Sequence, residues 1–243
     1  MNTITLAPGL TLIHGDCMEY LATLPDGAYS LAVCDPPYGI GAGLRKGRHS
    51  KGQNPGKFKT EKYKTGGWDN IPPGQTYFKQ LRRASNNQII WGGNHFAKNL
   101  PVSRGWIFWD KKPNVPNYSD GELAWSSFDC VLRRIEILWN GKIRTGIEPG
   151  YISIHPTQKP VALYRWLLQN YAKPGQTILD THMGSGSSAI AAWEMGYTFT
   201  GIEIDKDYFD AAVERIQKRL LSPYLPGIAG NEGKVEQVKL FCD

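Results

Sequence analysis

Short runs of apolar residues recur along the chain, and each run ends at polar or turn-forming residues. Runs of this length, bounded in this way, are typical of strands in a buried sheet. Six of them are predicted as strands: Leu10–His14, Leu31–Cys34, Gln88–Trp91, Gly105–Trp109, Thr177–Leu179 and Tyr197–Ile202.

Between these runs lie stretches with helical spacing of apolar residues. Near the end of the chain, Tyr208, Ala212 and Ile216 fall on one face, which predicts an outer helix packed on the sheet. Alternating strands and helices favour an α/β fold with a mostly parallel sheet, and a chain of 243 residues buries one substantial core. We therefore expect a single domain over residues 1–221 and a loosely structured tail at 222–243. The predicted helices are Cys17–Leu24, Gly74–Ala84, Pro160–Tyr171, Ser187–Met195 and Lys206–Leu221.

The charge of the chain is concentrated in one loop. The chain has a formal net charge of +6 and a pI near 9.0, whereas residues 41–66 alone hold eight basic residues against one acidic residue, Glu61, together with six glycines. Such a loop is either a solvated surface segment or a contact for a polyanion. It comes just after Asp35-Pro-Pro-Tyr38, a candidate catalytic motif, and this position favours contact with DNA phosphates. The basic residues are Arg45, Lys46, Arg48, Lys51, Lys57, Lys59, Lys62 and Lys64.

The apolar runs and the cysteines limit the classes of protein to which the chain can belong. No apolar run approaches the roughly 20 residues of a membrane span, and the first residues lack the features of a signal peptide, so we expect a cytoplasmic enzyme without a membrane partner. The four cysteines stand far apart with no Cys-x-x-Cys pair, so we expect neither a metal site nor a disulfide framework.

The sharpest chemical motif is Asp35-Pro36-Pro37-Tyr38, directly after the run Leu31–Cys34. The carboxyl end of a parallel strand is where open α/β sheets bind ligands. The Asp35 carboxylate and the Pro36 carbonyl could accept both hydrogens of an exocyclic amine, and Tyr38 could stack on a base flipped out of a duplex. The alternative is a plain turn after a strand.

A second motif joins a strand, a glycine turn and a helix over residues 178–189. Gly184 and Gly186 would let the backbone approach a ligand closely, and Glu203, at the end of the next strand, could accept both hydroxyls of a ribose. These features fit a cofactor that carries a nucleoside. They also satisfy the G-x-G-x-x-A pattern of NAD-binding proteins, so an NAD-dependent oxidoreductase stays open as an alternative.

A third motif, His155-Pro-Thr157-Gln-Lys159-Pro160, precedes a predicted helix. The Thr157 hydroxyl and the Lys159 amine could reach an anionic group such as a cofactor carboxylate. The alternative is a loop that only caps the helix.

These motifs together resemble the DNA amino-methyltransferases, which carry Asp-Pro-Pro-Tyr as their catalytic tetrapeptide. The resemblance covers about residues 10–220, with the tetrapeptide first and the cofactor turn last, as in the circularly permuted beta class. It implies a Rossmann-like methyltransferase domain with a seven-stranded, mostly parallel sheet and helices on both faces, and S-adenosyl-L-methionine as the cofactor. It also implies target recognition by residues of about 111–155.

The resemblance also assigns further residues. Asp180 matches the acidic position of the cofactor motif, although Thr181, His182 and Met183 depart from the family pattern. Asp16 and Cys17 match the opening segment, where the acidic residue lies near the cofactor's adenine; a helix-capping aspartate is the alternative. Asp at the first tetrapeptide position is commoner in adenine-N6 enzymes and Ser in cytosine-N4 enzymes, so we expect adenine N6, with cytosine N4 as the alternative. A homodimer, a phage or prophage origin and a restriction-modification role are compatible with the sequence but not predicted by it.

Overall fold

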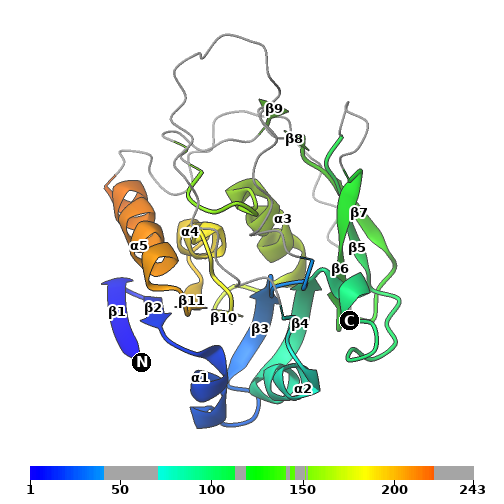
Figure 1. The fold of residues 1–243 in the computed structure, drawn as a ribbon, viewed down its shortest axis with the longest axis horizontal. Helices are drawn as coiled ribbons and strands as arrows, with labels where there is room; N and C mark the ends of the chain where they lie inside the picture. Colours follow the sequence, from blue (N-terminus) through cyan, green and yellow to red (C-terminus); the bar gives the residue numbers. More distant parts are fainter. Residues whose placement is uncertain (41–70, 113–118, 141–142, 146–150, 152, 222–243) are drawn as a thin grey trace.

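The computed structural model describes residues 1–40, 71–112, 119–140, 143–145, 151 and 153–221. Within this part of the chain, a nine-stranded sheet forms the centre of the molecule (Figure 1). In spatial order its strands are β1 (Asn2–Ala7), β2 (Leu10–His14), β11 (Thr198–Glu203), β10 (Thr177–Asp180), β3 (Tyr29–Cys34), β4 (Ser85–Trp91), β6 (Gly121–Ser126), β5 (Ile107–Asp110) and β7 (Arg133–Glu136).

The prediction of seven strands in a mostly parallel sheet is wrong in number, and the sheet is mixed. Five neighbouring pairs are parallel, and three are antiparallel: β1 with β2, β4 with β6, and β5 with β6. All six strands that the apolar runs predict are present. The strands β1, β6 and β7 escaped prediction because none contains a long apolar run: β1 alternates polar with apolar residues, β6 begins with Gly121 and Glu122, and β7 holds three charged residues.

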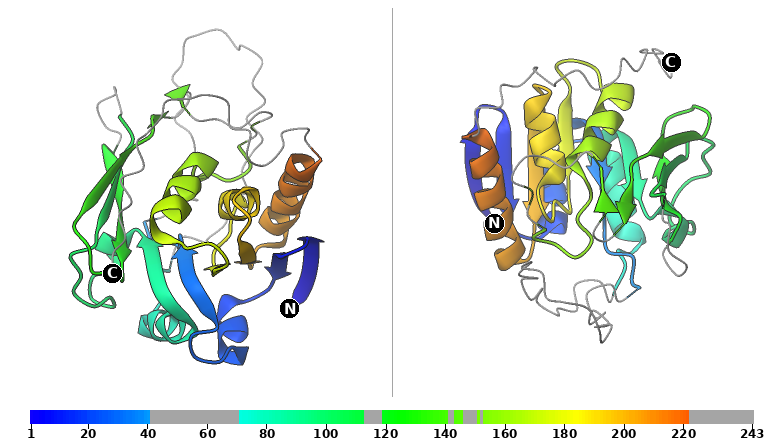
Figure 2. Two further views of the ribbon diagram at one scale, coloured as in Figure 1. Left: turned by 180° about the vertical axis from the view of Figure 1, so that it is seen from behind. Right: turned by 90° about the horizontal axis from the view of Figure 1, so that it is seen from above.

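Two layers of helices cover the sheet, which the views of Figure 2 show from behind and from above. One face carries α1 (Cys17–Thr23) and α2 (Gln75–Ala84), and the other carries α3 (Val161–Tyr171), α4 (Ser187–Glu194) and α5 (Lys206–Leu220). All five helices agree with the sequence prediction to within one residue at either end. A 3₁₀ turn η3 (Gly93–His95) and a small hairpin of β8 (Trp139–Asn140) and β9 (Ile143–Arg144) complete the described elements.

The alternation of side chains along β3 explains the two layers. Leu31 and Val33 point into the core under α3, α4 and α5, whereas Ala32 and Cys34 point into the core over α1 and α2. All four side chains are almost completely buried. Since both faces of this strand are covered, it reads in the sequence as a continuous apolar run, as central parallel strands do.

The parallel order β2-β11-β10-β3-β4 brings five strand ends to one edge of the sheet. Asp35, Asp180 and Glu203 each stand at or directly after a strand end along this edge. The topology therefore gathers residues that are up to 168 positions apart in the sequence, as predicted for an open α/β sheet.

The predicted division of the chain into a domain, two inserted segments and a tail stays a prediction. The basic loop 41–66 and the tail 222–243 lie outside the described residues. The region of about 111–155, expected to carry target recognition, contributes β6 and β7 to the main sheet, so part of it belongs to the core fold. Among the described residues, no helix combines the length and apolar character needed to cross a membrane.

Candidate functional site

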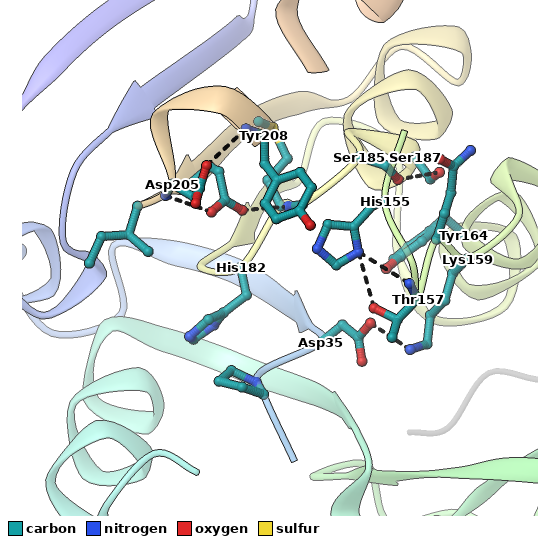
Figure 3. A pocket seen from close by; sticks show the side chains of 16 residues that line it. Asp35, His155, Thr157, Lys159, Tyr164, His182, Ser185, Ser187, Asp205 and Tyr208 are labelled. Atoms are coloured by element: carbon teal, nitrogen blue, oxygen red, sulfur yellow. Dashed lines mark hydrogen bonds and ion pairs between the residues drawn. The ribbon is translucent and has the colours of Figure 1, made fainter. Parts of the chain in front are cut away.

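A pocket lies at the carboxyl edge of the sheet (Figure 3). The lining side chains come from the tetrapeptide, the loop before α3, the glycine turn before α4 and the segment between β11 and α5. Of the residues singled out from the sequence, the pocket is lined by Asp35, Pro37, His155, Thr157, Lys159, His182, Met183, Gly184, Glu203 and Tyr208.

The two glycines of the turn have different surroundings. Gly184 has a φ of +52°, and a Cβ placed on it would meet nothing closer than His155 at 3.9 Å, so its backbone is open to the pocket. Gly186 has a φ of +75°, and a Cβ there would lie 2.8 Å from Cδ1 of Ile216 on α5. Gly186 is therefore favoured by its left-handed backbone and by its contact with α5, and it does not line the pocket.

Asp180 is completely buried beneath the turn. Its carboxylate accepts hydrogen bonds from the His182 backbone amide at 3.0 Å and from the Ser188 hydroxyl at 2.6 Å. Burial raises the pKa of Asp180 to about 7. In this structure Asp180 holds the shape of the turn from below and is not part of the pocket wall.

Glu203 is held in place by backbone amides at the end of β11. Its two carboxylate oxygens accept from the Gly184 amide at 2.9 Å and from the Asp205 amide at 2.9 Å. Burial raises its pKa above the ordinary value, while these amides act in the opposite direction. The turn and the carboxylate are thus fixed relative to each other, and the oxygens keep lone pairs for a ligand.

His155 and Thr157 form the wall opposite the turn. The Thr157 hydroxyl lies 3.1 Å from Nδ1 of His155, whose ring packs at 61° against that of Tyr208 with 4.4 Å between centroids. Burial and, to a smaller extent, the Lys159 cation together lower the pKa of His155 to about 4. The imidazole is therefore neutral at physiological pH.

Asp35 belongs to a group of partly buried charges around the buried Lys159 amine. Its Oδ2 is 2.5 Å from the Lys159 amine, and its Oδ1 accepts a 2.6 Å hydrogen bond from the Tyr38 hydroxyl. The same amine lies 3.0 Å from Oε2 of Glu122 on β6, and Oε1 of Glu122 is paired with Lys111. We call Asp35, Glu122, Lys159 and Lys111 the charge cluster; it holds two negative and two positive groups.

Burial and neighbouring charges oppose each other in the charge cluster. Burial raises the pKa of Asp35, Lys159 lowers it, Glu122 raises it again, and the result lies above the ordinary value. Burial would also raise the pKa of Glu122, but Lys159 and Lys111 outweigh it and hold that pKa at about 2. Burial lowers the pKa of Lys159, but the two carboxylates outweigh it and leave that pKa raised. Lys159 and Glu122 are therefore charged throughout the physiological range.

The ring of Tyr38 is packed tightly beside Asp35. His95 stacks on it with 5.0 Å between centroids and an interplanar angle of 14°. A Cβ placed on Gly92, whose φ is +68°, would lie only 2.2 Å from Cε1 of Tyr38. Hence Tyr38 is fixed both by the Gly92 backbone and by its hydroxyl bond to Asp35, and a base stacking on the ring must share it with His95 or displace His95.

Two residues from the opening segment lie apart from the pocket wall. The Asp16 side chain accepts a 2.7 Å hydrogen bond from the Met18 amide and caps α1. This is the helix-capping role that the sequence left open as the alternative for Asp16. Burial raises the pKa of Cys17 to about 12 and that of Cys34 to about 12, so both thiols are protonated at physiological pH. Neither thiol is activated as a nucleophile.

Several site residues were missed in the sequence. Glu122 gave no signal, because it lies in a strand that the apolar pattern does not reveal. Ile204, 64% exposed at the end of β11, could have been noticed as an apolar residue between Glu203 and Asp205. The other missed lining residues are Gln158, Tyr164, Ser185, Ser187 and Asp205.

The predicted DNA contacts Arg45, Lys46, Arg48, Lys51, Lys57, Lys59, Lys62 and Lys64 all lie outside the described residues. The segment that contains them begins three residues after Tyr38. Contact between this loop and DNA stays a prediction.

Residues 59–214 match a protein family model described as DNA methylase, of the N6 and N4 methyltransferase type. The matched range covers more than half of the chain and begins after Asp35-Pro-Pro-Tyr38. Among curated proteins, the Type II methyltransferase M2.DpnII of Streptococcus pneumoniae is 24% identical over 249 residues, which covers 86% of this chain and 90% of that protein.

Solved structures show the same fold. The M1.HpyAVI-SAM complex superposes with a TM-score of 0.52 and 21% identity, covering 84% of this chain and 98% of that one. The PvuII DNA methyltransferase, named as cytosine-N4-specific, superposes with a TM-score of 0.55 and 14% identity, covering 86% of this chain and 92% of that one. The nine-stranded mixed sheet is therefore a methyltransferase-type, Rossmann-like fold.

Proposed function

The chain belongs to the DNA methylase family of N6 and N4 methyltransferases, and we propose that it transfers a methyl group from S-adenosyl-L-methionine to the exocyclic amine of a DNA base, adenine N6. The observation that carries this proposal is the position of Asp35. Its carboxylate lines the same pocket as Gly184 and Glu203. The acceptor for an amine and the residues suited to a nucleoside thus line one pocket.

The pocket fits the proposed cofactor. A nucleoside suits this pocket for three reasons. The open backbone at Gly184 lets a ligand approach closely, the fixed carboxylate of Glu203 can accept from the ribose hydroxyls, and the exposed Ile204 offers an apolar surface. The Thr157 hydroxyl suits the anionic end of an amino acid. When bound there, S-adenosyl-L-methionine supplies a methyl group on a positively charged sulfur. The solved complex of M1.HpyAVI with SAM has the same fold and supports this assignment.

The residues of the tetrapeptide would prepare the amine. The nitrogen of an exocyclic amine shares its lone pair with the ring and is a poor nucleophile. Asp35 and the Pro36 carbonyl would accept its two hydrogens and draw the nitrogen toward tetrahedral geometry, while the Tyr38 ring would hold the base after it leaves the duplex. Methylation makes the nitrogen strongly acidic, so its proton passes to Asp35 or to water.

Adenine is proposed over cytosine on the identity of residue 35. The tetrapeptide begins with Asp, which resembles the adenine-N6 enzymes, whereas a Ser at this position is commoner in cytosine-N4 enzymes. The likeness in fold to a cytosine-N4-specific enzyme keeps cytosine as the second candidate. The order of motifs, with Asp35 before Gly184, supports the circularly permuted beta class.

A substitution at Gly92 tests the placement of Tyr38. Gly92→Ala is expected to lower methyl transfer by about 10²-fold, because the new Cβ would displace the Tyr38 ring and a misplacement near 1 Å has effects of this size. Gly175→Ala is the matched control: Gly175 also has a positive φ, +81°, but a Cβ there meets nothing within 4 Å. Initial rates with labelled cofactor would measure both variants. Equal activity in the two would show that the position of Tyr38 does not matter.

The basic loop provides a second prediction. Reversing the charge of Lys57, Lys59, Lys62 and Lys64 to Glu is expected to weaken DNA affinity and to flatten its dependence on salt, because fewer phosphate charges would be neutralised. Cofactor affinity should stay unchanged. Fluorescence anisotropy with labelled duplex DNA at several salt concentrations measures the effect. An unchanged salt slope would remove the loop from the DNA interface.

The competing assignment, an NAD-dependent oxidoreductase, is separated from the proposal by one titration. Calorimetry with S-adenosyl-L-methionine and with NAD⁺ should show binding of the first alone. The proposed activity itself is tested by incubating unmethylated plasmid DNA with cofactor labelled on the methyl group. Label should enter the DNA; binding of NAD⁺ with no label in DNA would reject the proposal.

A further inference from the structure

Both oxygens of the catalytic carboxylate are engaged by the protein itself. Oδ1 of Asp35 accepts from the Tyr38 hydroxyl at 2.6 Å, and Oδ2 lies 2.5 Å from the Lys159 amine. The Lys159 side chain is only 3% exposed, so water does little to screen its charge (Figure 3). A target amine must therefore compete with a hydroxyl and with a buried cation for the acceptor it needs.

Glu122 offers a second acceptor to the same two donors. Its Oε2 lies 3.0 Å from the Lys159 amine and 3.3 Å from the Tyr38 hydroxyl. The Lys159 amine also donates to the Tyr38 hydroxyl at 3.2 Å, so the donors form one connected network. Each donor can lean toward Asp35 or toward Glu122 by a small movement, without breaking the network.

The sheet holds Glu122 in place. It lies on β6, where it pairs in register with Trp109 of β5. Lys111, at the end of β5, binds its other oxygen and lies 4.6 Å from the centroid of the Trp109 ring. Glu122 is thus a fixed acceptor on a strand, whereas Asp35 lies just outside one.

We propose that Glu122 is a positioning residue that takes over Lys159 and the Tyr38 hydroxyl when the target amine engages Asp35. The inference rests on the proposed function and deepens it. In this exchange, Asp35 accepts hydrogen bonds from the target amine, and Glu122 accepts those of Lys159 and the Tyr38 hydroxyl.

The electrostatics of methyl transfer favour this exchange. The amine nitrogen becomes positively charged as it takes the methyl group, so a cation beside it opposes the reaction unless a carboxylate neutralises it. The charge cluster is neutral as a whole, because Glu122 and Lys111 balance each other as do Asp35 and Lys159. The pKa of Glu122, lowered to about 2, keeps this carboxylate charged at every working pH. Removing its charge would leave one excess positive charge beside the reacting nitrogen.

The test is the single-turnover rate of methyl transfer in Glu122→Gln. The rate should fall by about 10²-fold, the effect of misplacing a reacting group. The dissociation constant for S-adenosyl-L-methionine without DNA should match the wild type, because Glu122 does not line the pocket. Glu136→Gln is the matched control, since Glu136 lies on β7 of the same sheet, is 49% exposed and pairs only with surface cations. Its rate should equal that of the wild type.

A double-mutant cycle with Lys159→Met separates positioning from a general structural effect. If Glu122 acts through Lys159, the double variant should be no slower than Lys159→Met alone, so the two losses do not multiply. Multiplying losses, or a wild-type rate in Glu122→Gln, would overturn the inference. If Glu122→Gln does not fold, Glu122→Asp decides: a slower rate at an unchanged melting temperature supports the exchange, and an unchanged rate overturns it. A wild-type enzyme without transfer would instead refute the proposed function.

Discussion

Asp35→Ala is expected to lower methyl transfer to DNA by at least about 10³-fold, within the range that a positioned acceptor or general base contributes. The variant loses the acceptor for the target amine and leaves the buried Lys159 amine without its 2.5 Å partner. Glu122 remains at 3.0 Å from that amine and limits the damage to the fold. Initial rates with labelled S-adenosyl-L-methionine and plasmid DNA measure the effect, and DNA binding by anisotropy should persist.

Asp129→Ala is the control for this substitution. Asp129 forms an exposed ion pair with Arg104, with side chains 77% and 69% exposed, and such pairs contribute little. Its activity should equal that of the wild type. If Asp35→Ala retained a substantial rate, the tetrapeptide would not be the catalytic centre.

Lys159→Met is expected to lower the single-turnover rate by about 10²- to 10³-fold near neutral pH, because Asp35 would lose the cation that keeps its carboxylate ionised. It should also move the acidic limb of the pH profile to higher pH. Burial raises the pKa of Asp35, and Lys159 is the group that lowers it. Without Lys159, burial and the charge of Glu122 raise the pKa of Asp35 further, although the Tyr38 hydroxyl bond still lowers it. Asp35 would then stay protonated, and unable to accept from the amine, up to a higher pH.

The shift of the limb separates this account from a merely damaged fold. A structural defect would lower the rate by the same factor at every pH. Lys79→Met, on an exposed position of α2, is the control and should leave both the rate and the profile unchanged. A slow Lys159→Met enzyme with an unmoved acidic limb would contradict the role given to Lys159.

Much of the fold could be predicted because its central strands are buried on both faces. Strands such as β3 are uninterrupted apolar runs in the sequence, and all five helices agree with their predicted ranges to within one residue at either end. The edge strands could not be found in this way. In β7, Arg133, Arg134 and Glu136 are solvent-facing or paired on the surface, so only Ile135 signals burial.

The candidate site was predictable where function depends on local sequence. Asp35 follows a strand, Gly184 lies in the turn after one, and Glu203 ends one, and parallel topology brings these strand ends together. Glu122 could not be predicted, because its importance comes from the pairing of β6 between β4 and β5. The position of Lys159 is a similar case: the sequence suggested an anion as its partner, and only the folded chain identifies the Asp35 and Glu122 carboxylates beside it.

The proposed activity of this protein is the methylation of an exocyclic base amine in DNA. The most direct test is mass spectrometry of the nucleosides from unmethylated DNA after incubation with the enzyme and S-adenosyl-L-methionine carrying a deuterated methyl group. We expect N6-methyldeoxyadenosine that carries the deuterium. N4-methyldeoxycytidine would overturn the choice of adenine, and DNA without any labelled amino-methylated nucleoside would contradict the proposed activity itself.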